Sequence, residues 1–195
     1  MVIPIQMSKL YDIIAFSPLF EPNLNFFSQH LARGLLVKRN GNRLPSAANM
    51  LKMRYNCTLE SLALTHARLC TNTQSSGRSN IGENIAQISR SVARNKLQAI
   101  EKAVSRWWKQ SRGNVNIGQR VFYRAHHTPL AQFVQMAWSS THQLGCGIAG
   151  CSGFYNIVCQ YFPAMGTFNQ NIYQPGTPCS ACPSGFTCTD QVLCN

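Results

Sequence analysis

Acidic side chains are scarce in this sequence, which has six Asp and Glu residues against 18 Lys and Arg residues in a length of 195. The formal net charge is therefore +12. Such an imbalance favours acidic partners, namely glycosaminoglycans, anionic membranes or nucleic acid. Solubility without any specific partner explains the same charge equally well.

The C-terminal part lacks basic residues altogether, because every Lys and Arg lies at or before Arg124. From Ala125 to Asn195 the one acidic residue is Asp190. A basic part and a nearly neutral, cysteine-rich part therefore share one chain. The sequence also lacks a hydrophobic run long enough to predict a membrane span. Its length suits a single domain with a sizeable core.

A recognisable secretory leader is missing as well. Such a leader needs a basic start, an uninterrupted apolar stretch and a small-residue cleavage site. The apolar run at residues 13–16 is flanked by Asp12 and Pro18, which interrupt it. We expect either that the start is misassigned or that the leader is absent from this sequence.

Cysteine, in contrast, is abundant: nine residues, of which eight can pair and one is left over. This number predicts disulfides, an oxidising compartment and a secreted, extracellular protein. The spacing Cys179-x-x-Cys182 also suits zinc, but no second such pair or spaced His pair accompanies it. The sequon Asn56-Cys57-Thr58 predicts glycosylation of Asn56 in a secreted protein.

Hydrophobic spacing predicts several helices. We expect them over residues 23–37, 46–53, 59–70 and 91–110, and another that starts at Thr128-Pro129, where Thr caps the free N–H groups. In the helix at 91–110, the residues predicted to face inward are Ala93, Leu97, Ile100, Val104 and Trp107.

Two short strands are predicted over residues 144–149 and 154–161, around a Cys-Ser-Gly turn. Helices on both sides of a small antiparallel sheet indicate an α/β protein with a three-layer sandwich. Residues 1–22 show no clear pattern and are expected to be irregular.

Basic residues follow one face of the predicted helix at 91–110. We call these five residues the basic ridge: Arg90, Arg94, Lys102, Arg106 and Lys109. The ridge is either a surface that binds a polyanion or an ordinary solvated helix face, and the second is the commoner outcome for an amphipathic helix.

Three motifs occur in the same order as in a known family. Residues 130–138 have the sequence L-A-Q-F-V-Q-M-A-W, preceded by Gly82-Glu83-Asn84-Ile85 and followed by C-Q-Y-F-P at residues 159–163. The first resembles the G-H-F/Y-T-Q-M-V/A-W signature of the CAP superfamily of cysteine-rich secretory, antigen 5 and pathogenesis-related proteins. The cysteine-rich end is most similar to secreted nematode proteins of the activation-associated or venom-allergen-like group.

The resemblance implies the CAP three-layer α-β-α sandwich over residues 23–168 and a cysteine-rich, hinge-like tail over residues 169–195. In the family, two His and two Glu converge in a cleft that can hold a divalent metal. The matching positions here are Gln74, Glu83, Gln110 and Gln132. Gln lacks the charge and the imidazole nitrogen that favour zinc. We therefore expect no metal, no cofactor and no catalytic residues.

Two further expectations concern acid–base chemistry. Glu83 lies among three amides in this alignment and has no evident proton-transfer partner. His66 falls on an apolar helix stripe with Leu69, and we expect it to be a packed, hydrogen-bonded core residue. The chain is thus predicted to be a binding protein and not an enzyme.

The resemblance also implies four disulfides: Cys70–Cys151, Cys146–Cys159, Cys179–Cys188 and Cys182–Cys194. Cys57 remains, and we expect it to be a free, buried thiol unless it pairs between chains.

Three functions follow from these features. The first is a host-interaction or immunomodulatory binding protein whose partner is a host or extracellular protein or an anionic glycan. The second is a lipid or sterol carrier, since some family members bind apolar ligands. The third, a metal-dependent hydrolase, is opposed by the Gln substitutions. Nucleic-acid binding fits the charge but not the secretory cysteines.

Overall fold

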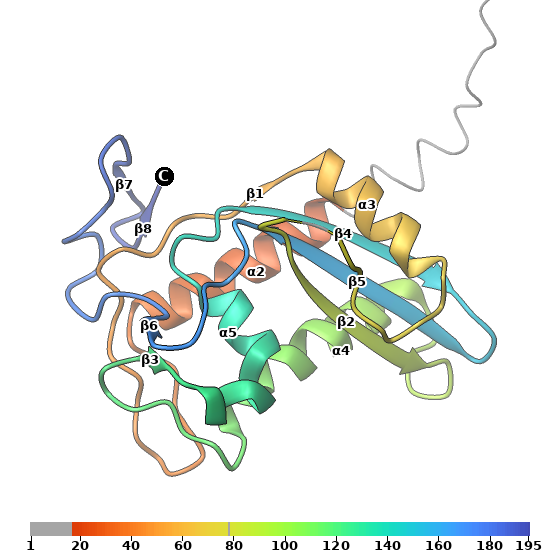
Figure 1. Ribbon diagram of the computed structural model, residues 1–195, viewed down its shortest axis with the longest axis horizontal. Helices are drawn as coiled ribbons and strands as arrows, with labels where there is room; N and C mark the ends of the chain where they lie inside the picture. Colours follow the sequence, from red (N-terminus) through yellow and green to blue (C-terminus); the bar gives the residue numbers. More distant parts are fainter. Residues whose placement is uncertain (1–16, 78) are drawn as a thin grey trace, which may run out of the picture.

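A computed structural model describes residues 17–77 and 79–195 of the chain, with side chains from Asn25 onward (Figure 1). Its α-helices are α2 (Ser17–Ala32), α3 (Cys57–Ala67), α4 (Lys96–Lys109) and α5 (Ala131–Ala137). Two 3₁₀ helices are η1 (Gln110–Arg112) and η2 (Ala125–Leu130). The apolar run at residues 13–16, which bears on the prediction about a secretory leader, lies outside the described residues.

The main sheet has the strand order β1-β4-β5-β2. Its strands are β1 (Arg54–Tyr55), β2 (Gly82–Ser89), β4 (Gln143–Gly150) and β5 (Phe154–Phe162). Strands β2, β5 and β4 pair antiparallel, whereas the short β1 joins β4 in parallel. Two smaller ribbons pair β3 (Phe122–Tyr123) with β6 (Gln170–Asn171), and β7 (Cys188–Thr189) with β8 (Leu193–Cys194).

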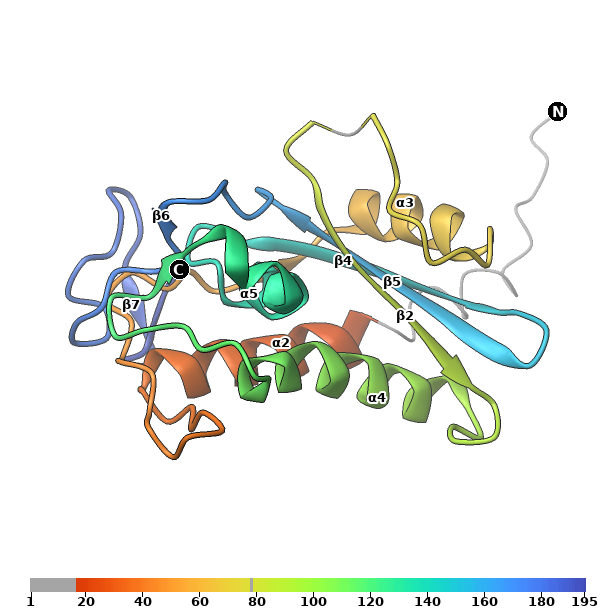
Figure 2. The ribbon, with the colours of Figure 1, turned by 60° about the horizontal axis from the view of Figure 1, so that its bottom comes forward.

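Helix α3 covers one face of the main sheet, and α2, α4 and α5 lie on the other (Figure 2). This arrangement confirms the predicted three-layer sandwich. The fully buried Trp107 and Ile100 of α4 pack against Ile157 and Tyr161 of β5. A second cluster joins α2 and α5 to the C-terminal tail.

Two glycines let α3 approach the sheet closely. A Cβ atom on Gly147 would overlap the backbone of Leu64, and one on Gly145 would overlap the backbone of Glu60. Side chains at these positions of β4 would therefore push the helix away. Gly145 and Gly147 therefore set the distance between the sheet and α3, and the polar cluster around Glu83 lies between these two layers.

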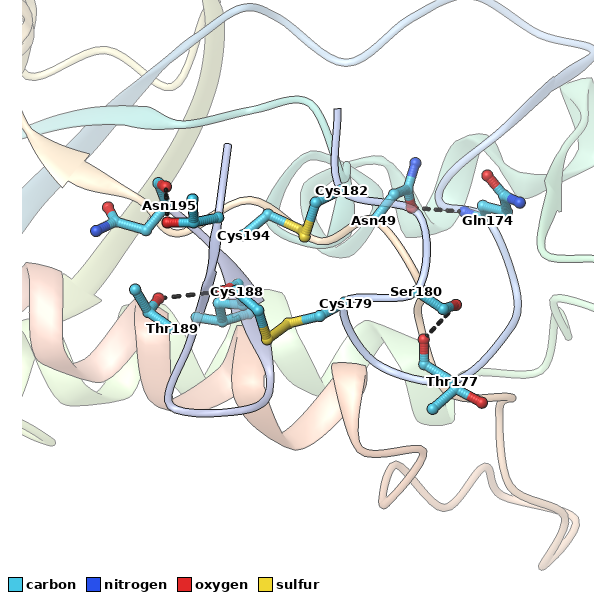
Figure 3. Close-up of a disulfide and its surroundings, with 12 residues drawn as sticks. Asn49, Gln174, Thr177, Cys179, Ser180, Cys182, Cys188, Thr189, Cys194 and Asn195 are labelled. Atoms are coloured by element: carbon cyan, nitrogen blue, oxygen red, sulfur yellow. Dashed lines mark hydrogen bonds between the residues drawn. A yellow bond between two sulfur atoms is a disulfide. The ribbon is translucent and has the colours of Figure 1, made fainter. Parts of the chain in front are cut away.

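The four disulfides join Cys70 to Cys151, Cys146 to Cys159, Cys179 to Cys188, and Cys182 to Cys194. These are the pairs that the resemblance implies. The last two close the tail (Figure 3), where the Gln174 backbone N–H also donates to the Asn49 side chain. Because Cys179 and Cys182 both form disulfides, their thiolates are not available to zinc.

Residues 46–53 do not form the predicted helix. Ala47 makes a β-bridge to Pro175, and Leu51 makes one to Cys194. The tail thus supplies the hydrogen bonds that a helix would have made internally. The structure also departs from the expected irregular start, because residues 17–22 already belong to α2. Pro18 falls in the first turn, where its missing N–H needs no partner.

Helix α4 begins at Lys96 and not at Ser91, since Asn95 caps it by accepting a hydrogen bond from the Gln98 N–H at 2.9 Å. Four of the predicted inward residues are buried, but Leu97 is 41% exposed. Leu97 lies in the first turn of α4 and is not part of the hydrophobic cluster that packs against the sheet. The stripe on α3 is likewise shorter than predicted, because Leu69 follows the end of the helix and is 68% exposed.

The predicted cap at Thr128 is wrong. The Thr128 hydroxyl donates backward to the Ala125 carbonyl at 2.6 Å, and Pro129 lies inside η2. Helix α5 therefore starts at Ala131. Gln132 still falls in the first turn and Trp138 at the end, as predicted.

Candidate functional site

The side chain of Glu83 is the centre of a buried polar cluster between β2 and α3. It is 8% exposed and receives four hydrogen bonds. His66 Nδ1 lies 2.8 Å from Oε2, and the Gln160 amide donates to the same oxygen at 2.9 Å. The Ser75 hydroxyl donates to Oε2 at 2.8 Å, and the Ser75 backbone N–H donates to Oε1 at 2.9 Å.

The protonation of Glu83 follows from these contacts. Burial by itself raises the pKa of the carboxyl group, but the hydrogen bonds from Ser75, His66 and Gln160 together outweigh it and lower the pKa below its usual value. Glu83 is therefore a carboxylate at neutral pH. Each hydrogen bond that it accepts is strengthened because the acceptor carries a full negative charge.

His66 corrects the expectation that Glu83 has no partner for proton transfer. The ring is 4% exposed, so it is a packed core residue as predicted, but it also hydrogen-bonds to the Glu83 carboxylate. Within the described residues, no Ser, Thr or Cys side chain hydrogen-bonds to its second ring nitrogen. The Ser75 hydroxyl donates to Glu83 and not to the imidazole, so these contacts contain no Ser–His pair of the kind that covalent catalysis uses.

A polar hollow of about 350 Å³ opens beside His66. The residues that line it are Thr65, His66, Leu69, Thr71, Thr73, Gln74, Ser75 and Ser76. Hydroxyl and amide groups dominate this lining. The hollow thus offers hydrogen-bonding groups beside an apolar surface of similar extent, which includes Leu69.

Gln110 and Gln132 pair with each other on the opposite side of the sheet from α3. The Gln110 amide donates to Gln132 Oε1 at 2.8 Å, and Gln110 Oε1 accepts from the Phe133 backbone N–H at 3.0 Å. The Gln132 amide donates to the Ile85 carbonyl of β2 at 2.8 Å. Both amide oxygens are thus already occupied as acceptors.

Gln74 is an exposed loop residue whose amide donates to the Glu83 backbone carbonyl at 3.2 Å. The three Gln residues therefore do not surround the Glu83 carboxylate, which points toward α3. Their side-chain amides already make hydrogen bonds to the backbone and to each other. This donor set does not fit the divalent metal that the family implies.

Side chains cover the outer edge of β2 along its length. Its carbonyls accept hydrogen bonds at Glu83 from Gln74, at Ile85 from Gln132 and Trp107, and at Gln87 from Arg106. Two of the positions that match metal residues in the family thus satisfy the backbone of an edge strand. Sequence motifs place these residues, but only the sheet order shows this role.

The basic ridge follows α4 from the turn after β2. All five of its side chains are exposed. Arg90 lies over the Tyr155 ring, 5.1 Å from its centroid, and Arg106 donates to the Gln87 carbonyl at 3.3 Å. Within the described residues, none of the five forms an ion pair with a carboxylate. Their charge faces solvent.

Asn56 caps the start of α3. Its Oδ1 accepts from the backbone N–H groups of Thr58 and Leu59, and its Nδ2 donates to Gln143 at 2.7 Å. Glycosylation of Asn56 remains a prediction, and a glycan on Nδ2 would replace the bond to Gln143. Cys57 is free but exposed, not buried as expected. It occupies the first turn of α3.

A sequence model of the cysteine-rich secretory protein family, CAP, matches residues 33–161. The chain belongs to the CAP family. The CAP fold is also shared with nematode proteins: the crystal structure of Na-ASP-1 superposes with a TM-score of 0.85 at 33% identity. It covers 93% of this chain and 47% of that one. The structure of NaASP2 with Zn²⁺ gives a TM-score of 0.83 at 30% identity, covering 92% and 94%.

Relatives of this CAP protein include the Ancylostoma secreted protein of Ancylostoma caninum, at 35% identity over 85% of the chain. The chain spans about 40% of the length of that relative. Hookworm platelet inhibitor 1 of the same species is 32% identical, covering 77% of this chain and 74% of its own length. In the described part of the CAP protein, no helix is long and apolar enough to cross a membrane.

Proposed function

We propose that this CAP protein is a non-enzymatic binding protein that acts outside the cell and holds an anionic glycan on its basic ridge. The observation that carries the proposal is the ridge itself, with five exposed cations, none of which forms an ion pair with a carboxylate of the described residues. Unpaired surface charge of one sign attracts polyanions and speeds their association.

The geometry of the ridge suits a linear ligand. Lys102, Arg106 and Lys109 are spaced by four and three residues on α4, so they lie on one face and extend over about 10 Å at 1.5 Å per residue. Arg94 and Arg90 extend the charge beyond the start of the helix. A chain of sulfated sugars can contact such a row at several points at once.

The absence of enzymatic activity is supported by the chemistry of the polar cluster. Three of the four family positions offer amides, and the one hydroxyl that hydrogen-bonds to the His66–Glu83 pair within the described residues, Ser75, donates to the carboxylate and not to the imidazole. Relatives are named a platelet inhibitor and, in cattle, peptidase inhibitor 16. These names favour extracellular partners, and a protein partner is the second outcome that the experiment below tests.

The experiment is retention on immobilised heparin in a rising salt gradient. The ridge variant carries Arg94→Glu, Lys102→Glu and Lys109→Glu, three side chains without structural contacts. A matched control carries Arg33→Glu, Arg43→Glu and Arg68→Glu, which are also exposed and change the net charge equally.

We expect the ridge variant to elute at much lower salt than the wild type and the control to elute close to it. The salt dependence of binding should also become shallower in the ridge variant, since fewer ionic contacts form. Equal losses in both variants would show that net charge alone causes retention. The same variants immobilised for capture of extracellular proteins would then test a protein partner.

A further inference from the structure

A second basic region lies away from α4, around the loop that leads into β3. Two adjoining hollows of about 310 and 440 Å³ share Arg120, Phe122 and Arg124. The first is completed by Asn116, Gly118, Gln119, Val121, His126 and His127. The second is completed by Asn171 and Pro175. Neither lining includes an Asp or a Glu.

The two guanidinium groups are free to bind a ligand. Within the described residues, neither Arg120 nor Arg124 makes an ion pair or a side-chain hydrogen bond. Arg124 lies over the Phe122 ring, 5.7 Å from its centroid, which restricts the orientation of its planar head. An arginine that is held in place but unpaired loses less conformational entropy when it binds.

The backbone that carries these side chains is held firmly. Phe122 of β3 pairs with Asn171 of β6. Val121 is fully buried with a φ of 52°, a left-handed conformation that β-branched residues rarely adopt. It is fixed by hydrogen bonds from its N–H to Gly118 and from the Ile172 N–H to its carbonyl, at 3.0 and 2.9 Å. Backbone strain of this kind clusters at ligand sites.

His127 is a buried member of the lining of the first hollow. The ring is buried beside Tyr123, and its Nδ1 accepts the Arg124 backbone N–H at 3.0 Å. Burial, followed by the proximity of His126 and Arg124, lowers the pKa of His127. The same lining holds Arg120 and Arg124 and no carboxylate, and this charge would favour an anion.

We propose that the hollows around Arg120 and Arg124 bind a sulfate or phosphate monoester whose attached group rests against Phe122. Guanidinium groups match the oxygens of such groups by paired hydrogen bonds. Asn116 and Asn171 can donate from the two hollows, and the half-buried Phe122 offers a flat apolar surface to a sugar ring or a glycerol chain. The site is separate from the basic ridge and does not depend on the function proposed for it.

The test is titration of the folded protein with inorganic sulfate and, separately, inorganic phosphate at constant ionic strength, followed by NMR. The pocket variant is Arg120→Gln with Arg124→Gln. The control, Lys102→Gln with Lys109→Gln, makes the same change in net charge on the ridge. A third variant, Arg120→Lys with Arg124→Lys, keeps the charge but removes the guanidinium fork.

We expect saturable binding by the wild type and by the control, with affinities within about twofold of each other. The pocket variant should bind about tenfold more weakly or not measurably, and the lysine variant should fall between them. Saturation should also raise the pKa of His127, because a bound anion stabilises its protonated form. Binding that does not saturate, or that both double variants lose equally, would overturn the proposal.

Two esters distinguish the sources of the ligand. N-acetylglucosamine 6-sulfate represents a sulfated glycan, and glycerol 3-phosphate represents a lipid headgroup. The ester that binds more tightly than its inorganic anion, and loses that advantage in Phe122→Ala, identifies the class. If neither ester binds more tightly than its inorganic anion, the role assigned to Phe122 is wrong.

Discussion

Replacing Glu83 by Gln tests whether the buried carboxylate stabilises the sandwich. In Glu83→Gln the amide oxygen can take the place of Oε2 and keep the bonds from His66, Gln160 and the Ser75 hydroxyl. The amide NH₂ then faces the Ser75 backbone N–H, so that donor is left without an acceptor. An unsatisfied buried donor costs about 1–3 kcal/mol, and loss of the charge weakens the three remaining bonds. We expect a total loss of about 3 kcal/mol at pH 7.

Chemical unfolding with the disulfides intact measures this loss. For a chain of this size, a change of about 3 kcal/mol corresponds to a fall in Tm of roughly 6–12 °C. The matched control is Glu101→Gln, the same substitution at an exposed position of α4, where we expect a change within about 0.5 kcal/mol.

The pH dependence gives the sharper test. Since folding lowers the pKa of Glu83, the carboxylate contributes stability above its unfolded pKa, and this contribution disappears as the pH falls through the folded value. The wild type and Glu83→Gln should therefore differ most near neutral pH and converge in acid. A difference that stays constant down to pH 2, or is absent at pH 7, would refute the role given to the carboxylate.

Two further experiments test the packing of α3 on the sheet and the positions that match metal residues in the family. Gly147→Ala should lower the free energy of unfolding by about 3 kcal/mol, because the new methyl group overlaps the α3 backbone, whereas Gly118→Ala, with open space around it, should have little effect in the same denaturation assay. Gln74→His with Gln132→His should raise the affinity for zinc at least tenfold by calorimetry over a wild type that binds no tighter than about millimolar, since both side chains reach the same strand edge. An unchanged zinc affinity would show that the two positions do not converge.

Local sequence patterns predicted those elements well whose side chains pack in the hydrophobic core. The strands around the Cys-Ser-Gly turn appear within a residue or two of their predicted bounds, and Trp107 and Ile100 are buried as the helical spacing required. Residues 46–53 were mispredicted because they hydrogen-bond to Gln174, Gly176 and Cys194, more than a hundred residues away. No local pattern contains that pairing.

The polar cluster was harder to predict, for a related reason. Sequence motifs identified Glu83, but His66 becomes its partner only because β2 alternates its side chains and turns this one toward α3. The pocket around Arg120 gave no signal at all, since it depends on the pairing of β3 with β6 and on the left-handed backbone of Val121.

The covered edge of β2 has a consequence for how this protein meets others. Extended peptides often bind by adding a strand to an open sheet edge, where unpaired carbonyls and N–H groups await them. Here Gln74, Gln132, Trp107 and Arg106 already occupy the carbonyls on that side. With these carbonyls occupied, the outer edge of β2 offers fewer free acceptors to an added strand, which disfavours pairing there with an extended peptide or with the sheet of a second copy.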